Sequence, residues 1–213
     1  MRRAGRLAAA VLAAAAILAL PFFVLVRTSV WLDRAAGWSA WPAVIGSILL
    51  AAGVLLVYAV VAARRVTGRT RLPRFTRRGL AILVACYSVY AVVYLAAGNA
   101  KGQEVRESYR ALHPSLRLAV ATLILLDGDA VLSDARRVPE DYPRMGLRPL
   151  AGSAHYEQDD GWVHALDLRT RGRSGLRNAL VRVYFEALGF QTLRHTGTAD
   201  HLHVSLPAVS RNG

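Results

Sequence analysis

Three segments of the C-terminal half carry side chains that could do chemistry. His155 lies in a turn-rich segment, Asp167 lies in an apolar run, and His203 closes an Asp-His-Leu-His sequence that starts at Asp200. Two histidines and one carboxylate, with one coordination position left open, form the ligand set of a catalytic zinc site. His155, Asp167 and His203 could supply this set from three separate segments.

Strand geometry decides which neighbouring side chains can join them. Side chains two apart in a strand share a face, and side chains three apart do not. His201 and His203 therefore point the same way if their segment is extended. His164 points away from the face of Asp167, so the two are poor partners despite their closeness in sequence. A carboxylate such as Asp167 rarely occupies an apolar strand without a partner.

The elements that must position these residues form a small α+β domain over residues 100–213. Arg117 interrupts the apolar run 112–127, which favours a buried helix over a further membrane-spanning one. Gly189 is placed to end a second, amphipathic helix. The expected order is helix 112–127, strand 130–133, loop 139–150, strand 163–168, helix 176–188, and strands 191–194 and 201–206.

Residues 1–99 have a different character. They hold twelve arginines and a single acid, Asp33, and they contain the long charge-free apolar stretches 7–26, 43–63 and 79–98. A membrane-spanning helix needs ~20 apolar residues. We therefore predict a membrane domain of three transmembrane helices within residues 1–99, followed by the α+β domain.

The arginines predict how these helices are oriented. Loops rich in Lys and Arg stay in the cytoplasm, which puts the N-terminus and the arginine-rich loop 64–78 inside. Loop 27–40 and everything after residue 99 then lie outside the cytoplasmic membrane. The basic charge is explained by this orientation and by anionic lipid headgroups, so no nucleic-acid partner is expected. A cleaved signal peptide is the competing interpretation of stretch 7–26, and it leaves the C-terminal domain on the same side.

The sequence also disfavours a cysteine-based site and a transport path. Cys86 is the only cysteine, which excludes an intrachain disulfide or a thiolate metal cluster. The interiors of the three apolar stretches hold no ionisable side chain, which argues against an ion or proton path through the membrane.

The order of the C-terminal motifs resembles the zinc D-alanyl-D-alanine carboxypeptidase family, which includes related murein endopeptidases and dipeptidases. That family shows Ser-x-x-Arg, then Ser-x-His, then Gly-x-Ala-x-Asp, and finally a late strand with a zinc histidine. The matching sequence, within roughly residues 110–207, runs Ser133-Asp134-Ala135-Arg136, Ser153-Ala154-His155, Ala165-Leu166-Asp167 and His201-Leu202-His203. The resemblance leaves the membrane half unexplained.

The resemblance implies a fold and a set of roles. The C-terminal domain would adopt the zinc carboxypeptidase fold, and His155, Asp167 and His203 would bind Zn²⁺. Arg136 would hold a substrate carboxylate or steady the transition state, and Ser153 would belong to the substrate-binding part of the site. The protein would then hydrolyse peptide bonds in peptidoglycan stem peptides from the outer side of a bacterial cytoplasmic membrane.

The chain also departs from the family pattern. Eleven residues separate His155 from Asp167, more than the family has, because of the insert 156–163. The general base usually precedes the last ligand; His201 is favoured because it shares the strand face of His203, and Asp200 is the alternative. Arg137 is expected to be a surface charge.

The long spacing motivates a second hypothesis. The domain could keep the peptidase fold without catalysis and bind a cell-wall peptide or a partner protein.

Overall fold

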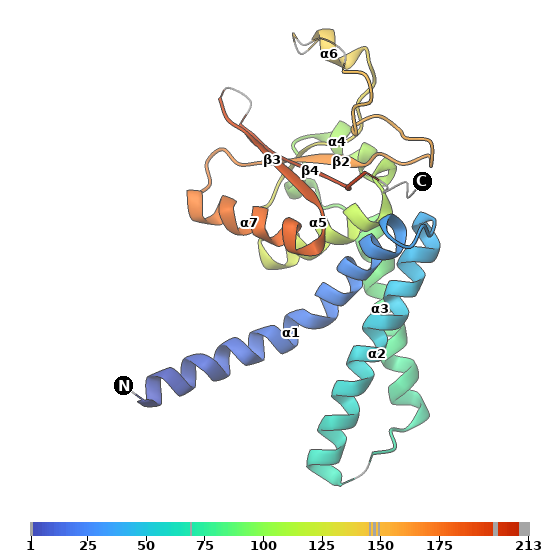
Figure 1. Cartoon of the computed structure of the whole chain (residues 1–213), viewed down its shortest axis with the longest axis vertical. Helices are drawn as coiled ribbons and strands as arrows, with labels where there is room; N and C mark the ends of the chain where they lie inside the picture. Colours follow the sequence, from blue (N-terminus) through green and yellow to red (C-terminus); the bar gives the residue numbers. More distant parts are fainter. Residues whose placement is uncertain are drawn as a thin grey trace.

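Three long helices form the first part of the molecule. They are α1 (Arg2–Arg34), α2 (Ala40–Thr67) and α3 (Arg74–Val93), and each is long and apolar enough to cross a membrane. The computed structural model describes residues 2–68, 70–144, 146, 148, 150–197 and 200–208. In Figure 1 these helices extend from one side of the C-terminal domain, with α2 and α3 side by side. The three predicted helices are therefore present.

The third helix differs from the predicted stretch 79–98. It begins at Arg74 and ends at Val93, after which Tyr94 is extended. Leu95 is buried in the core, and the Asn99 amide donates hydrogen bonds to the carbonyls of Gly128 and Ala130, at 2.8 and 2.9 Å. The last apolar residues of the predicted stretch are therefore used to join the C-terminal domain and do not extend the helix.

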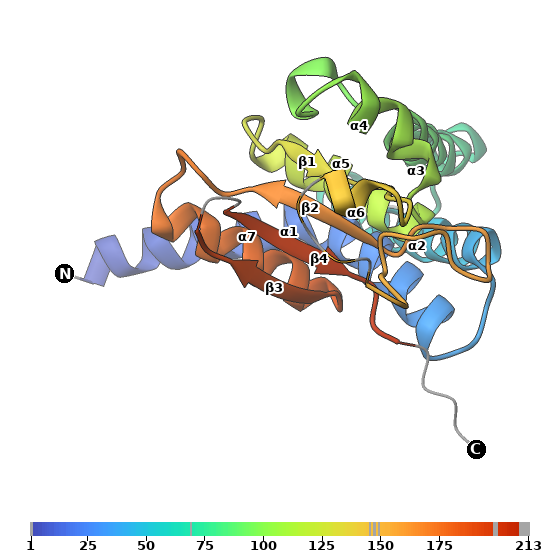
Figure 2. The ribbon, with the colours of Figure 1, turned by 90° about the horizontal axis from the view of Figure 1, so that it is seen from above.

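The C-terminal part is the expected small α+β domain. Its four strands form one antiparallel sheet in the order β1-β2-β4-β3 (Figure 2). A short helix, α6, lies inside the segment predicted to be a loop, 139–150. The elements are η1 (Ala97–Asn99), α4 (Gln103–Ser108), η2 (Tyr109–Ala111), α5 (Pro114–Leu126), β1 (Leu132–Asp134), α6 (Asp141–Arg144), β2 (Ala165–Arg169), α7 (Gly175–Leu188), β3 (Gln191–His195) and β4 (His201–Ser205).

Local chemistry fixes the ends of the two main helices. The His113 ring accepts a hydrogen bond from the Ser115 amide at the start of α5, where Pro114 has no amide hydrogen to satisfy. Ser174 accepts from the Arg177 amide at the start of α7. Gly189 ends α7 with a φ of 94°, a left-handed conformation that glycine adopts without strain.

One face of the sheet is apolar and buried, and the other carries polar side chains. Leu166, Leu168, Leu202 and Val204 are buried in one core cluster with residues of α5 and α7, including Phe185. The intervening residues of β2 and β4 point to the opposite face, as strand alternation requires. That opposite face carries the polar candidates of the sequence analysis.

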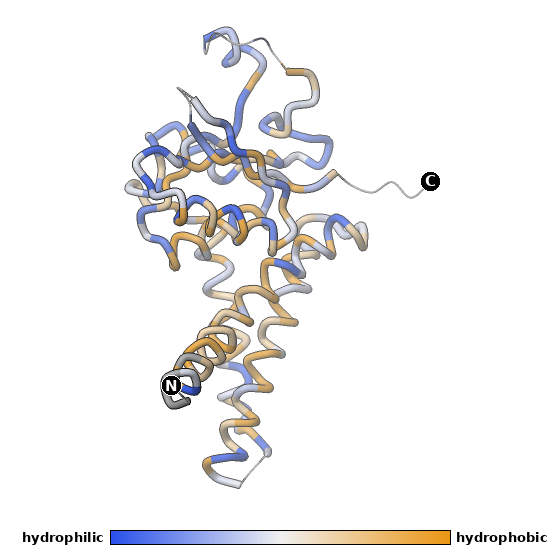
Figure 3. The backbone as a smooth tube through the Cα atoms, turned by 60° about the vertical axis from the view of Figure 1, so that its left-hand side comes forward, coloured by the Kyte–Doolittle hydropathy of each residue, from blue (hydrophilic) through white to orange (hydrophobic). Residues whose placement is uncertain are grey.

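One apolar core joins the two parts of the chain. Leu25, Val26 and Val30 of α1 are fully buried and belong to the same cluster as Leu116 and Phe185 of the C-terminal domain. The hydropathy colouring shows the apolar helices running directly into that domain (Figure 3). The predicted boundary at residue 99 falls inside η1, and the core continues across it.

Candidate metal centre

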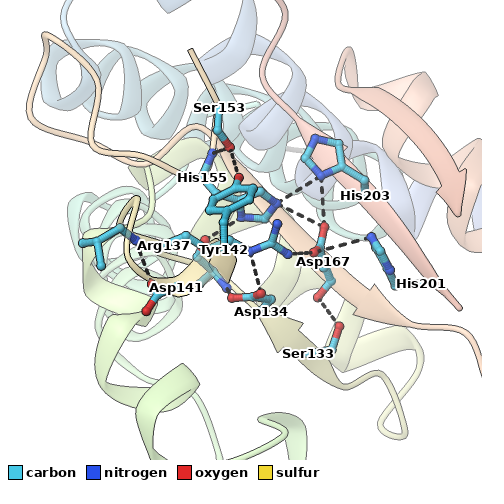
Figure 4. A network of polar contacts seen from close by, with 12 residues as sticks. Ser133, Asp134, Arg137, Asp141, Tyr142, Ser153, His155, Asp167, His201 and His203 are labelled. Atoms are coloured by element: carbon cyan, nitrogen blue, oxygen red, sulfur yellow. Dashed lines mark hydrogen bonds and ion pairs between the residues drawn. The ribbon is translucent and has the colours of Figure 1, made fainter. Parts of the chain in front are cut away.

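Three elements bring the predicted ligands together. Asp167 lies on β2, and His203 lies directly opposite on β4 as its strand partner. His155 comes from the loop that precedes β2 and points toward both of them (Figure 4). His155 and Asp167 are almost fully buried, while His203 is partly exposed. One edge of the cluster therefore remains open to solvent.

The candidate ligand atoms form a nearly equilateral triangle. Asp167 Oδ1 lies 3.0 Å from His203 Nδ1 and 3.2 Å from His155 Nε2, and the two nitrogens are 3.2 Å apart. A circle through three such atoms has a radius of about 1.8 Å, shorter than zinc–ligand bonds of ~2.0–2.2 Å. A point at zinc-bond distance from all three atoms therefore exists just outside their plane. The side chains fit a tetrahedral ion with one position left open.

The first histidine is held by the backbone. His155 Nδ1 lies 2.6 Å from the carbonyl oxygen of Ala135, and the Arg137 amide donates to the His155 carbonyl at 2.9 Å. A carbonyl accepts only from a protonated nitrogen, so His155 Nδ1 carries the hydrogen, and Nε2 has a lone pair for a metal ion whenever the ring is neutral. Backbone acceptors of this kind orient metal-binding histidines.

The Asp167 carboxylate is surrounded by basic groups. Its Oδ2 accepts from Arg137 at 2.6 Å and lies 3.5 Å from His201 Nε2. Burial alone would raise the pKa of Asp167, but hydrogen bonds from His155 and His203 and the nearby imidazoles outweigh it. The pKa of Asp167 therefore lies far below its usual value, and the group is ionised at neutral pH.

Arg137 corrects one expectation. It is not a surface charge: its guanidinium bridges Asp134 at 2.7 Å and Asp167 at 2.6 Å, and it lies over the Tyr142 ring. Burial opposes the charge on Arg137, but the two carboxylates more than compensate and raise its pKa. Arg136, the arginine that the resemblance assigns to substrate, is half exposed and pairs with Glu157 at 3.2 Å.

The two candidate bases lie on different faces. His201 is beside the centre, and its ring stacks on that of His195 at 4.7 Å between centroids. Asp200 instead accepts hydrogen bonds from Arg194 and from the Thr170 hydroxyl, both at 2.7 Å. The hydrogen bonds from Arg194 and Thr170 lower the pKa of Asp200. The structure therefore places His201 beside the cluster, whereas Asp200 is bound to Arg194 and Thr170.

The motif serines shape the backbone around the ligands. Ser153 is buried, accepts from the Tyr142 hydroxyl at 2.8 Å and from the His155 amide at 3.3 Å. Ser133 donates to the Asp167 carbonyl at 3.1 Å. Ser153 is thus placed to hold the loop that carries His155, and Ser133 to hold β2.

The insert 156–163 leaves the ligands in place and packs against the first part of the chain. The Trp162 ring meets the Trp41 ring edge to face at 6.0 Å, and the Arg117 guanidinium lies 5.1 Å from the Trp162 ring centre. Asp160 accepts from His164 at 2.8 Å, and His164 also lies 3.3 Å from Arg34 of α1. His164 therefore faces away from Asp167, as predicted, and belongs to the contact with α1.

Two residues near the centre, Arg137 and His195, are absent from the predicted set of site residues. The sequence indicates the position of Arg137 only weakly: it lies three residues after Asp134, with which it could pair, and next to the motif arginine. The sequence indicates the position of His195 more clearly, because a hairpin of strands 191–194 and 201–206 pairs it with His201.

No family model, curated protein or solved structure matches this chain. The fold and site define the molecule at a coarser level. It has three long apolar helices suited to a membrane and a small domain with a four-stranded antiparallel sheet. That sheet bears a His-Asp-His cluster capable of holding a metal ion.

Proposed function

We propose that this protein is a membrane-anchored, zinc-dependent peptidase that hydrolyses peptide bonds in peptidoglycan stem peptides. The observation that carries the proposal is the convergence of His155 Nε2, Asp167 Oδ1 and His203 Nδ1 within 3.2 Å of one another. The likeness of the motif order to zinc carboxypeptidases supports the choice of substrate. The arginine distribution supports a C-terminal domain outside the bacterial cytoplasmic membrane.

The ligand set accounts for the chemistry. Zinc bound there would lower the pKa of a coordinated water toward ~7 and polarise the scissile carbonyl. His155 and His203 would present neutral nitrogens, and Asp167 would supply the single negative charge. Arg137 would keep that carboxylate ionised and fixed in direction, since it binds the oxygen that faces away from the two histidines.

The remaining steps fall to residues at the edge of the cluster. His201 would take a proton from the attacking water and return it to the leaving amine, a role that positioned histidines commonly play. His195 stacks on the His201 ring and would keep it in position. Arg136 is exposed and would need to exchange Glu157 for a substrate carboxylate.

Metal content and hydrolysis test this proposal together. The full chain, purified in detergent, is expected to hold about one zinc per chain by elemental analysis, as a single three-ligand site requires. His203→Ala should lose the zinc and the release of stem-peptide fragments from muropeptides, measured by mass spectrometry. His195→Ala removes a nearby histidine outside the triangle and should keep the zinc. A wild-type chain without zinc at near-equimolar level would overturn the proposal.

A second candidate function is binding without catalysis. The favouring observation is that His155, Asp167 and His203 already satisfy one another as a hydrogen-bonded network, which can stabilise the sheet without an ion. The domain would then bind a cell-wall peptide or a partner protein. Zinc-free protein that binds muropeptides without cleaving them would select this function.

A further inference from the structure

Helix α7 has two apolar faces. Val181, Phe185 and Leu188 are buried against the domain. Leu176, Leu180 and Val183 follow one another at steps of four and three residues, so they share a different face, and all three are exposed. An exposed apolar stripe of this length needs a partner, because water is a poor solvent for it.

The end of α5 adds to this stripe. Leu125 and Leu126 are also exposed, and they occupy the last turn of α5. The next residue, Asp127, binds Arg173 and Arg177, which lie just before and within the first turn of α7. We call Leu125, Leu126, Leu176, Leu180 and Val183 the apolar ledge.

The ledge lies level with the long apolar helices. The Thr122 hydroxyl of α5 is 2.8 Å from the Tyr87 hydroxyl of α3, and the Tyr87 ring contacts Phe22 of α1. Tyr87 is six residues from the end of α3 at Val93, or about 9 Å along a helix that rises ~1.5 Å per residue. Helix α5 therefore packs beside the apolar part of α3, not beyond its end.

The neighbouring helix follows α5 to the same depth. The Tyr184 hydroxyl of α7 donates to the Ala119 carbonyl of α5 at 2.7 Å. Figure 1 shows α5 and α7 on the side of the sheet that faces the three long helices. Amphipathic helices in membrane interfaces bury their apolar faces by ~5–10 Å, which matches this depth.

We propose that the apolar ledge is inserted into the lipid leaflet on the side of the C-terminal domain. The acyl chains of that leaflet cover Leu125, Leu126, Leu176, Leu180 and Val183, while Arg182 and Glu186 pair on another side of α7 toward the headgroups. The domain is then attached to the membrane by its own helices as well as by α1, α2 and α3. This inference does not depend on zinc or on peptidase activity.

Spin labels in the full chain test the ledge directly. Cys86→Ala removes the native thiol, and single labels are attached through Leu180→Cys and Leu126→Cys in phosphatidylethanolamine–phosphatidylglycerol vesicles. The matched control is Leu193→Cys, because Leu193 is 56% exposed and Leu180 is 60% exposed, but Leu193 lies on the far face of the sheet. The measurement is collision of each label with lipid-soluble oxygen and with a water-soluble nickel chelate.

The outcomes separate the possible partners. Labels at 180 and 126 should collide several-fold more often with oxygen than with the nickel chelate, and the label at 193 should show the reverse. A label at 180 that behaves like the one at 193 would show that water covers the ledge and would overturn the proposal. Labels shielded from both reagents would also overturn it, because a second protein chain would then cover these residues.

Discussion

At the scale of single residues, Asp167 organises the candidate centre through both of its oxygens. Oδ1 faces His155 and His203, while Oδ2 faces Arg137 and His201. Asp134 lies opposite Asp167 on the neighbouring strand, so two carboxylates would repel each other without the guanidinium between them. The charge of Arg137 is therefore part of the structure of the site.

Replacing Arg137 should be far more damaging than replacing its neighbour. Arg137→Gln removes the positive charge between two close carboxylates and should lower the free energy of unfolding by about 3 kcal/mol. Arg136→Gln removes an exposed pair with Glu157 and should change it by less than about 0.5 kcal/mol. Denaturant unfolding of the full chain in detergent measures both. Equal effects would contradict the role given to Arg137.

The two candidate bases can be separated by kinetics. His201→Gln should reduce kcat about 10²–10⁴-fold while the zinc content stays unchanged, because a general base is lost. Asp200→Asn should keep most of the activity, since Asp200 is bound to Arg194 and Thr170 on the other face. The opposite ranking would transfer the role of base to Asp200.

The convergence of His155, Asp167 and His203 could be predicted at this scale, but the position of Arg137 could not. Period-two alternation placed His201 and His203 on one face, and motif order added His155 and Asp167. Arg136 and Arg137 follow β1, whose register with β2 is irregular between Leu132 and Asp134, so strand alternation does not predict which of the two faces Asp167. Such irregularities change which side chains point inward, and no residue type in this segment predicts the irregularity.

At the scale of elements, the insert 156–163 connects the metal-site loop to the first part of the chain. Trp162 lies against Trp41 in the first turn of α2 and against the buried Arg117. The extra residues between His155 and Asp167 thus form a contact with α2 and α5, and His155 still lies beside Asp167 and His203.

Removing the indole of the insert should weaken this contact. Trp162→Ala loses the ring pair with Trp41 and the cation–π contact with Arg117, together worth about 2 kcal/mol of unfolding free energy. Asp159→Asn, an exposed change in the same insert, should have little effect. Thermal unfolding followed by circular dichroism compares the two. Equal midpoints for both variants would show that the insert does not fasten the domain.

The same contact should be sensitive to acid. Burial and the nearby charge of Arg34 lower the pKa of His164, and Asp160 only partly opposes them. The stabilisation from neutral His164 is therefore complete above its unfolded pKa of ~6.5 and is lost as the pH falls through the lower folded value. The unfolding midpoint should drop between pH 7.5 and pH 5, and less so in His164→Gln. An unchanged pH dependence in the variant would exclude His164 as its source.

Most elements could be predicted, and the exceptions have physical reasons. A long apolar run predicted α5, and an amphipathic pattern ending at Gly189 predicted α7. The bounds of α3 differ from the predicted stretch 79–98, because hydropathy identifies only the charge-free residues. Arginine has a high helix propensity, so the helix can begin earlier, at Arg74. The short α6 was missed because Pro143 lies within it.

At the scale of the whole molecule, the two halves share one core. Leu25, Val26 and Val30 of α1 are as apolar as the exposed residues before them, and nothing in their type distinguishes a side chain that is buried in protein from one that would face lipid. The sequence therefore predicted two separate parts. The shared core depends on how the chain folds back on itself, which periodicity does not reveal.

The C-terminal half should not fold alone. A fragment of residues 100–213 would expose the surface that covers Leu25, Val26 and Val30, at a cost of about 1.5–3 kcal/mol for each side chain. The sum is comparable with the ~5–15 kcal/mol that stabilises a typical domain. The fragment is expected to lack near-ultraviolet dichroism and cooperative unfolding. A fragment with a sharp thermal transition would show that the shared core is dispensable.

The packing of the C-terminal part of α1 against α5 and α7 has a consequence for reach. A domain on a long flexible stalk can reach far from its anchor, whereas this domain is packed directly against α1. A hydrolase built in this way would work at one fixed height and would meet only the strands closest to the bilayer. Under the proposed function, the peptides that it cleaves would lie next to the bilayer, and distant layers of the wall would stay beyond its range.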